Sequence, residues 1–113
     1  MKKQRLLFIQ LPQLDNDRRG GSENEKLAAA YLRYSLEQSR ESSHFEPIIA
    51  PPETDRLDNR HFIEYVQSER PAIVAATLYA WNVERSLRVL QQIRQAQPAV
   101  RIIVGGPEVA RGH

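Results

Sequence analysis

The stretch AIVAATLYAWNVERSLRVLQQIRQAQ, residues 72–97, decides the fold because an apolar run turns into a helical pattern within it. Residues 71–78 are almost continuously apolar, which is typical of a strand buried on both faces of a parallel sheet. An apolar stripe at helical spacing then predicts a helix over 83–97. Its members are Val83, Leu87, Leu90 and Ile93. AVRIIVGGPEVA (99–110) follows as another strand, a Gly-Gly turn and Pro107 at the start of a further helix.

Two more strands are expected upstream of this unit. RLLFIQL (5–11) is a short, mostly apolar run that ends at Pro12, and FEPIIAP (45–51) is the second. Pro47 has no N–H to donate to a ladder, so FEPIIAP is expected at the edge of the sheet.

Helical patterns follow both upstream strands. Ser22 and Glu25 form a capping box for a helix of about four turns. Its spaced residues are Leu27, Ala28, Tyr31, Leu32, Ser35 and Leu36. The next helix is expected to be capped by Asp58 or Asn59. Its apolar residues are Phe62, Ile63 and Val66.

The alternation of strand and helix predicts an α/β fold in which one open parallel sheet is flavodoxin-like or Rossmann-like. The expected strand order is 2-1-3-4, which puts the Pro47 strand at an edge and the apolar third strand inside. We treat residues 1–113 as one domain. Ligands of such sheets bind beyond the carboxyl ends of the strands.

Composition excludes several classes of function. The chain has no cysteine, so it holds no disulfide, thiolate metal site or iron-sulfur cluster. Its net charge is only +2, and its lysines and arginines are scattered among acidic residues, which argues against binding to nucleic acid. No apolar run approaches the roughly 20 residues that a membrane span needs. A soluble, cytoplasmic protein with no membrane or nucleic-acid partner is therefore expected.

Catalytic and metal-binding patterns are also missing from the sequence. Neither of the phosphate-binding loop motifs GxGxxG and GxxxxGK[ST] follows the first strand, which argues against nucleotide binding of those two types. His44, His61 and His113 show no metal-ligand spacing, and no nucleophile with a base can be assembled at the carboxyl ends of the strands. The chain alone is expected to have no catalytic residues and no protein-ligated metal.

The candidate binding residues lie in two turns that follow neighbouring strands. They are Thr77, Tyr79, Trp81 and Asn82 after the third strand, with Gly105, Gly106 and Pro107 after the fourth. Glycines allow a close approach to backbone, although a Gly-Gly pair equally fits a plain turn. Asn82 also fits a helix N-cap, and Trp81 also fits a core or interface ring.

The segment TLYAWNVERSLRVLQQIRQAQPAVRIIVGGPEVA (77–110) resembles the N-terminal cobalamin-binding domain of cobalamin-dependent radical-SAM proteins. A strand, an aromatic-Trp-Asn-x-Glu turn, a helix, a strand and GGPE follow in the same order. The resemblance implies that cobalamin lies over the carboxyl ends of the strands. It assigns the nucleotide tail to Gly105, Gly106 and Pro107, and the corrin or its side arms to the turn 77–82.

The sequence departs from the family pattern in two respects. DxHxxG is absent after the first strand, and Leu11 to Gly21 holds no histidine, so cobalamin is expected to bind without a histidine from that loop. Without cysteine, the iron-sulfur cluster and S-adenosylmethionine of such an enzyme would belong to a separate C-terminal radical-SAM domain. The chain is therefore expected to be the N-terminal part of a longer protein, truncated before a fifth strand.

Two functions follow from these observations. The first is a cobalamin-binding module of a radical-SAM enzyme, which positions the cofactor for methyl transfer or related radical chemistry. The alternative is a cofactor-free interaction domain of the same fold. Self-association through the strand Arg101–Val104 is also expected, because that strand would be an uncovered apolar edge.

Overall fold

Four parallel strands form one open sheet in the order β2-β1-β3-β4 in the computed structural model, which describes residues 2–12 and 26–111. This confirms the expected α/β architecture. The strands are β1 (Gln4–Ile9), β2 (Phe45–Ile49), β3 (Ile73–Thr77) and β4 (Arg101–Gly105). The α-helices are α1 (Leu27–Glu37), α2 (Asn59–Glu69) and α3 (Val83–Ala96). Short 3-10 turns are η1 (Arg40–Ser43), η2 (Pro52–Arg56) and η3 (Pro107–Arg111).

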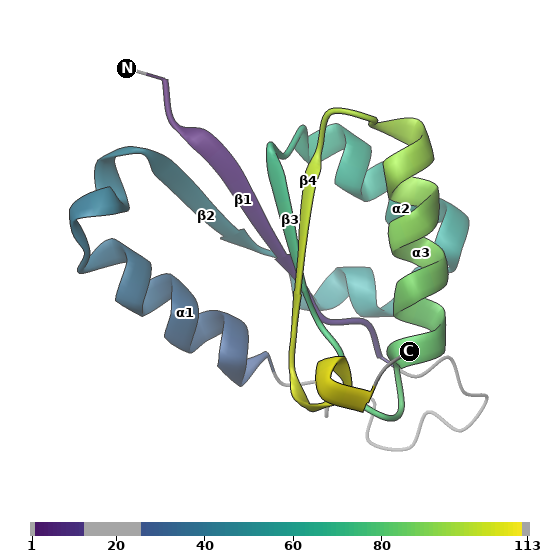
Figure 1. Cartoon of the computed structure of the whole chain (residues 1–113). Coiled ribbons are helices and arrows are strands. Elements are labelled where there is room, and N and C mark those ends of the chain that lie inside the picture. The colour runs from purple at the N-terminus through teal and green to yellow at the C-terminus, as the bar shows by residue number, and fades with distance from the viewer. Residues whose placement is uncertain (1, 13–25, 112–113) are drawn as a thin grey trace.

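The main core lies between one face of the sheet and the helices α2 and α3, which run side by side on that face (Figure 1). Alternate residues of each strand point into it, as the period of two along a strand requires. The sheet contributes Leu7, Ile9, Val74 and Ala76, and the helices contribute Phe62, Val66, Val89, Leu90 and Ile93. This core fixes the sheet and the start of α3 against each other.

The edge position of β2 was also expected, and the hydrogen bonds explain it. The Gln4 N–H donates to the His44 carbonyl, and the Ala50 N–H donates to the Phe8 carbonyl. The backbone N–H and C=O groups of even-numbered residues in β2 therefore point toward β1, and those of odd-numbered residues point away from the sheet. Pro47 is odd, so its missing N–H removes no bond from the sheet.

Helix α2 begins at the expected cap. The Asp58 carboxylate accepts a hydrogen bond from the His61 backbone N–H at 2.8 Å and lies 2.7 Å from the His61 ring Nδ1. The backbone bond, more than the ring contact, lowers the pKa of Asp58 below its usual value. The sequence had left open whether Asp58 or Asn59 is the cap, and the structure selects Asp58.

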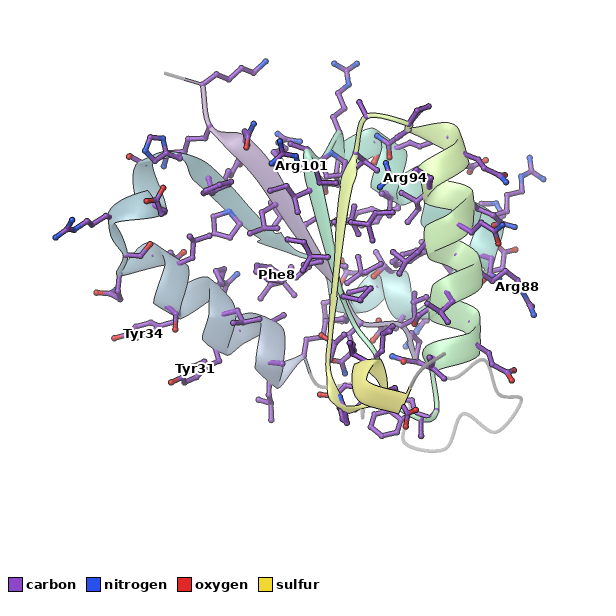
Figure 2. The ribbon with its side chains drawn as sticks, viewed as in Figure 1. Phe8, Tyr31, Tyr34, Arg88, Arg94 and Arg101 are labelled. Atoms are coloured by element: carbon purple, nitrogen blue, oxygen red, sulfur yellow. The ribbon has the colours of Figure 1, made fainter. Side chains whose placement is uncertain are left out.

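Helix α1 is shorter than expected and turns its apolar side chains outward. It has 11 residues, about three turns, and its expected capping box lies outside the described residues. Ala29 is its one buried residue, whereas Leu27 is 70% and Tyr31 is 72% exposed. Figure 2 shows Tyr31 and Tyr34 pointing away from the sheet. Small alanine side chains let α1 approach the sheet, and the larger residues are left at the surface.

None of the helices in the described ranges 2–12 and 26–111 has the length and apolar character that crossing a bilayer requires.

Candidate functional site

Asn82 joins the carboxyl ends of β1 and β3. Its side-chain Oδ1 accepts a hydrogen bond from the Tyr79 N–H at 2.8 Å. Its Nδ2 donates to the Leu11 carbonyl at 2.9 Å and to the Thr77 carbonyl at 3.2 Å. The residue is only 1% exposed, so these bonds replace water completely.

The role of Asn82 differs from a side-chain helix cap. It is the N-cap residue of α3 by position, and its carbonyl accepts from the Ser86 N–H at 2.8 Å. Its side chain, however, makes no cap bond and turns back to the preceding loop. Because its side-chain amide is buried and fully hydrogen-bonded, Asn82 supports the turn after β3 from beneath.

Arg85 fixes the neighbouring loops from the first turn of α3. Its guanidinium donates to the Pro12 carbonyl at 3.0 Å, to the Leu57 carbonyl at 3.0 Å and to the Asn59 Oδ1 at 2.7 Å. Arg85 was not predicted as a site residue from the sequence, because its partners lie 26 to 73 positions away. An arginine on a helix with a strong apolar stripe gives no local sign of such contacts.

The backbone of Leu78 joins the carboxyl ends of β3 and β4. Its N–H donates to the Gly105 carbonyl at 2.7 Å, and its carbonyl accepts from the Glu108 N–H at 3.3 Å. Gly106 lies against the same peptide with φ at 101°. A Cβ on Gly106 would come within 2.5 Å of the Leu78 carbonyl oxygen. Glycine at this position is therefore required by the turn itself.

Gly105 has a different environment from Gly106. It is exposed, it pairs with Thr77 in the β3–β4 ladder, and a Cβ added to it would meet nothing within 4 Å. Pro107, also exposed, begins η3. Gly105 therefore has free space above its Cα that a ligand could occupy, whereas the corresponding space at Gly106 is filled by Leu78.

Tyr79 and Trp81 form an aromatic pair on the turn above Asn82. Their ring centroids are 4.4 Å apart and their planes differ by 4°. Trp81 remains 51% exposed, so it is not a core residue. The rings provide a flat apolar surface on the same side of the molecule as the open backbone of Gly105.

The predicted residues therefore come together at one rim, defined here as Thr77–Asn82 and Gly105–Pro107. Thr77 and Gly105 are register partners, and Leu78 links the two turns. Exposed surface for a ligand comes from Trp81, Gly105 and Pro107, while Tyr79 is half-buried. Asn82 and Gly106 instead hold the two turns in place.

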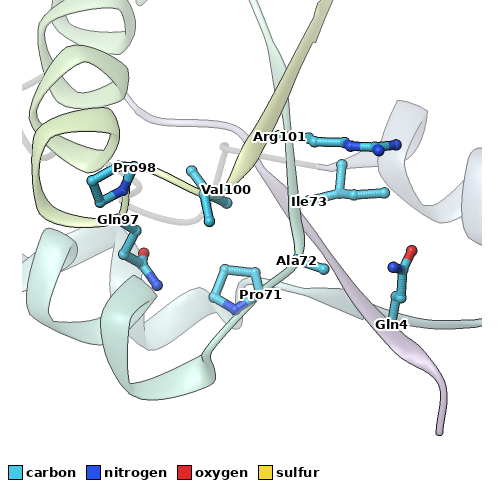
Figure 3. A pocket seen from close by; sticks show the side chains of 9 residues that line it. Gln4, Pro71, Ala72, Ile73, Gln97, Pro98, Val100 and Arg101 are labelled. Atoms are coloured by element: carbon cyan, nitrogen blue, oxygen red, sulfur yellow. The ribbon is translucent and has the colours of Figure 1, made fainter.

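Two hollows in the described structure lie away from this rim. One of about 480 Å³ is lined by Gln4, Ile73, Val100 and Arg101, at the amino ends of three strands (Figure 3). Another of about 510 Å³ lies between the end of α1 and the start of β2. Parallel sheets bind ligands at the opposite, carboxyl ends of their strands, so we assign neither hollow to the site.

Titratable groups in the described residues do not form a metal site, because no group of three or more histidine or acidic side chains comes together. His61 lies beside Asp58 in α2, and His44 lies 4.0 Å from Glu41 before β2. Neither histidine belongs to the turns of the rim.

The family model described as the B12 binding domain matches residues 19–112. The chain belongs to the B12-binding domain family. No curated protein matches it in a sequence search. Family membership supports cobalamin as the ligand, and the open backbone and exposed aromatic surface of the rim are compatible with a large, flat molecule.

Asn82→Asp tests the buried amide. The substitution replaces the Nδ2 donor by an oxygen that faces two carbonyl oxygens, and we expect unfolding free energy to fall by about 3 kcal/mol. Gln91→Glu, the same chemical change at an exposed position of α3, should change it by less than about 0.5 kcal/mol. Denaturant titration measures both. Equal, small effects would contradict the role of Asn82.

The two glycines should respond differently to alanine. Gly106→Ala introduces a contact with the Leu78 carbonyl at a positive φ, and we expect it to cost about 2 kcal/mol or more. Gly105→Ala extends into open space and should stay within about 1 kcal/mol of the parent. Urea unfolding of both variants provides the comparison, and a Gly106→Ala protein of parental stability would refute the steric account.

Proposed function

We propose that the chain binds cobalamin at the rim Thr77–Asn82 and Gly105–Pro107, as a non-catalytic module of a radical-SAM enzyme. The observation that carries the placement is the pairing of an open glycine backbone with an exposed aromatic surface at the carboxyl end of the sheet. Family membership supports the ligand, and the resemblance of residues 77–110 supports the radical-SAM context.

The rim residues have separate roles in this proposal. Gly105 and Pro107 leave room for the nucleotide tail, and Tyr79 and Trp81 cover apolar surface of the corrin or its side arms. Asn82 and Gly106 are positioning residues because both are engaged with neighbouring backbone. Their effect on the ligand is exerted through the shape of the two turns.

Cobalamin binding of this kind uses no histidine from the loop after β1, because residues 11–21 contain none. The bound cofactor supplies methyl-transfer or related radical chemistry. The chain's own residues bind and orient it, while S-adenosylmethionine and an iron-sulfur cluster belong to a separate radical-SAM domain, since this chain has no cysteine.

Gly105→Val and Trp81→Ala test the placement. A valine fills the open space over Gly105 and suits a strand, and alanine removes the exposed ring. We expect each folded variant to bind cobalamin at least about tenfold more weakly in equilibrium dialysis, which corresponds to about 1.4 kcal/mol.

Ala99→Val is the matched control, because Ala99 is exposed and lines the hollow at the amino ends of the strands. It should retain parental affinity. Loss of affinity in Ala99→Val with none in the two rim variants would move the site to that hollow. A parent chain that folds and binds no cobalamin would favour the cofactor-free interaction domain.

A further inference from the structure

Arg85 lies in the helix that follows β3 and contacts the segments that follow β1 and β2. Its Nη1 donates to the Pro12 carbonyl after β1. Its Nη2 donates to the Leu57 carbonyl and its Nε to the Asn59 Oδ1, in the segment that leads from β2 into α2. Leu57 and Asn59 flank Asp58, the residue that caps α2. One side chain therefore connects the segments beyond the carboxyl ends of three strands.

Arg85 and Asn82 hold the same stretch of backbone after β1. The Asn82 Nδ2 donates to the Leu11 carbonyl, and the Arg85 Nη1 donates to the next carbonyl, that of Pro12. The two residues are three positions apart at the start of α3, a spacing that makes side chains neighbours on a helix. The positions of Leu11 and Pro12 relative to the turn Thr77–Asn82 are thus set by two consecutive hydrogen bonds.

The local preference of α3 does not explain an arginine at this position. The N-terminus of a helix carries partial positive charge, so a cation in the first turn is electrostatically unfavourable. Glu84, in the same turn, follows the usual preference for an acidic residue, whereas Arg85 opposes it. Arg85 is half-buried and makes long-range bonds instead. Departures from local preference of this kind are concentrated at functional sites.

The arrangement of the acceptors requires a guanidinium. Three different nitrogens of Arg85 donate to three oxygens on two segments of the chain. Lysine carries all its donors on one nitrogen, and so does glutamine, so neither reproduces the planar fork of arginine. Arg85→Lys therefore removes the fork and keeps the positive charge, whereas Arg85→Gln removes both.

We propose that Arg85 is a positioning residue of the rim. It holds the turn Thr77–Asn82 in a fixed place relative to the segments that follow β1 and β2, and it acts through these segments rather than by contact with the ligand. The inference rests on the proposed function, because it makes the affinity for cobalamin depend on a residue outside the rim. It also predicts that the conformation of the stacked pair Tyr79 and Trp81 depends on Arg85 in the ligand-free chain.

Near-ultraviolet circular dichroism of the ligand-free chain tests this positioning. Trp81 is the only tryptophan, so its band reports on this turn. We expect Arg85→Lys and Arg85→Gln, each shown to be folded by far-ultraviolet circular dichroism, to lose much of that band. Arg88→Gln is the matched control, because Arg88 is exposed on α3 and points away from the sheet (Figure 2). It should leave the band unchanged.

Equilibrium dialysis with cobalamin gives the second readout. We expect Arg85→Lys and Arg85→Gln to bind at least about fivefold more weakly than the parent, and Arg88→Gln to bind equally well. Asn59→Ala removes one acceptor and leaves the bonds to Pro12 and Leu57, so it should weaken binding less. In the Arg85→Gln background, Asn59→Ala should add little, because Asn59 acts through Arg85.

The outcomes separate this inference from the proposed function. Parental affinity in the folded Arg85 variants overturns the inference, whatever their loss of unfolding free energy. A parent chain that folds and binds no cobalamin overturns the proposed function instead. The ligand-free spectra then decide whether Arg85 positions the turn, and a parental tryptophan band in both Arg85 variants would show that it does not.

Discussion

The geometry of the rim depends on the buried side chain of Asn82. Parallel strands end at the same side of the sheet, but their following loops leave in different directions, and nothing in the ladder aligns them. One amide reaches the Leu11 carbonyl after β1, the Thr77 carbonyl at the end of β3 and the Tyr79 N–H of the turn. The Asn82 side chain therefore fixes the position of the turn that carries Trp81 relative to the end of β1.

A second layer of contacts extends this arrangement to the loops around it. Arg85 holds Pro12, where the described part of β1's following segment ends, against Leu57 before α2. Lys26, at the start of α1, forms a 3.0 Å ion pair with Asp55 of η2, and both side chains are mostly buried. Pro12 and Lys26 are thus each held by contacts to the segment that leads from β2 into α2, through Leu57 and Asp55.

Periodicity predicted the strands, the helices α2 and α3 and the strand order, because these follow from which residues must be buried. Pro47 identified an edge through its missing N–H alone. The bond from Asn82 to Leu11 and the bonds of Arg85 could not be predicted, since they join residues from 26 to 73 positions apart along the chain. The separate roles of the two glycines could not be predicted either, because the two are adjacent and identical in sequence but differ in φ and in what surrounds them.

Helix α1 exposes the apolar side chains that its sequence spacing brings to one side. Spacing identified a helix but not which side of it is buried, and the small Ala29 rather than Tyr31 faces the sheet. The grouping of the candidate site residues was predictable, because they lie at the ends of neighbouring strands and the strand order determines which turns are adjacent. Family membership supports cobalamin as the ligand of the domain.

An amide chemical-shift map of the isotopically labelled chain, recorded during titration with cobalamin, tests the location of the site most directly. We predict that the largest changes cluster at Tyr79–Asn82, Gly105 and Gly106, while Ile73, Ala99 and Arg101 at the amino ends of the strands stay unchanged. Changes centred on those amino-end residues, or no changes at a saturating concentration of cobalamin, would contradict the account.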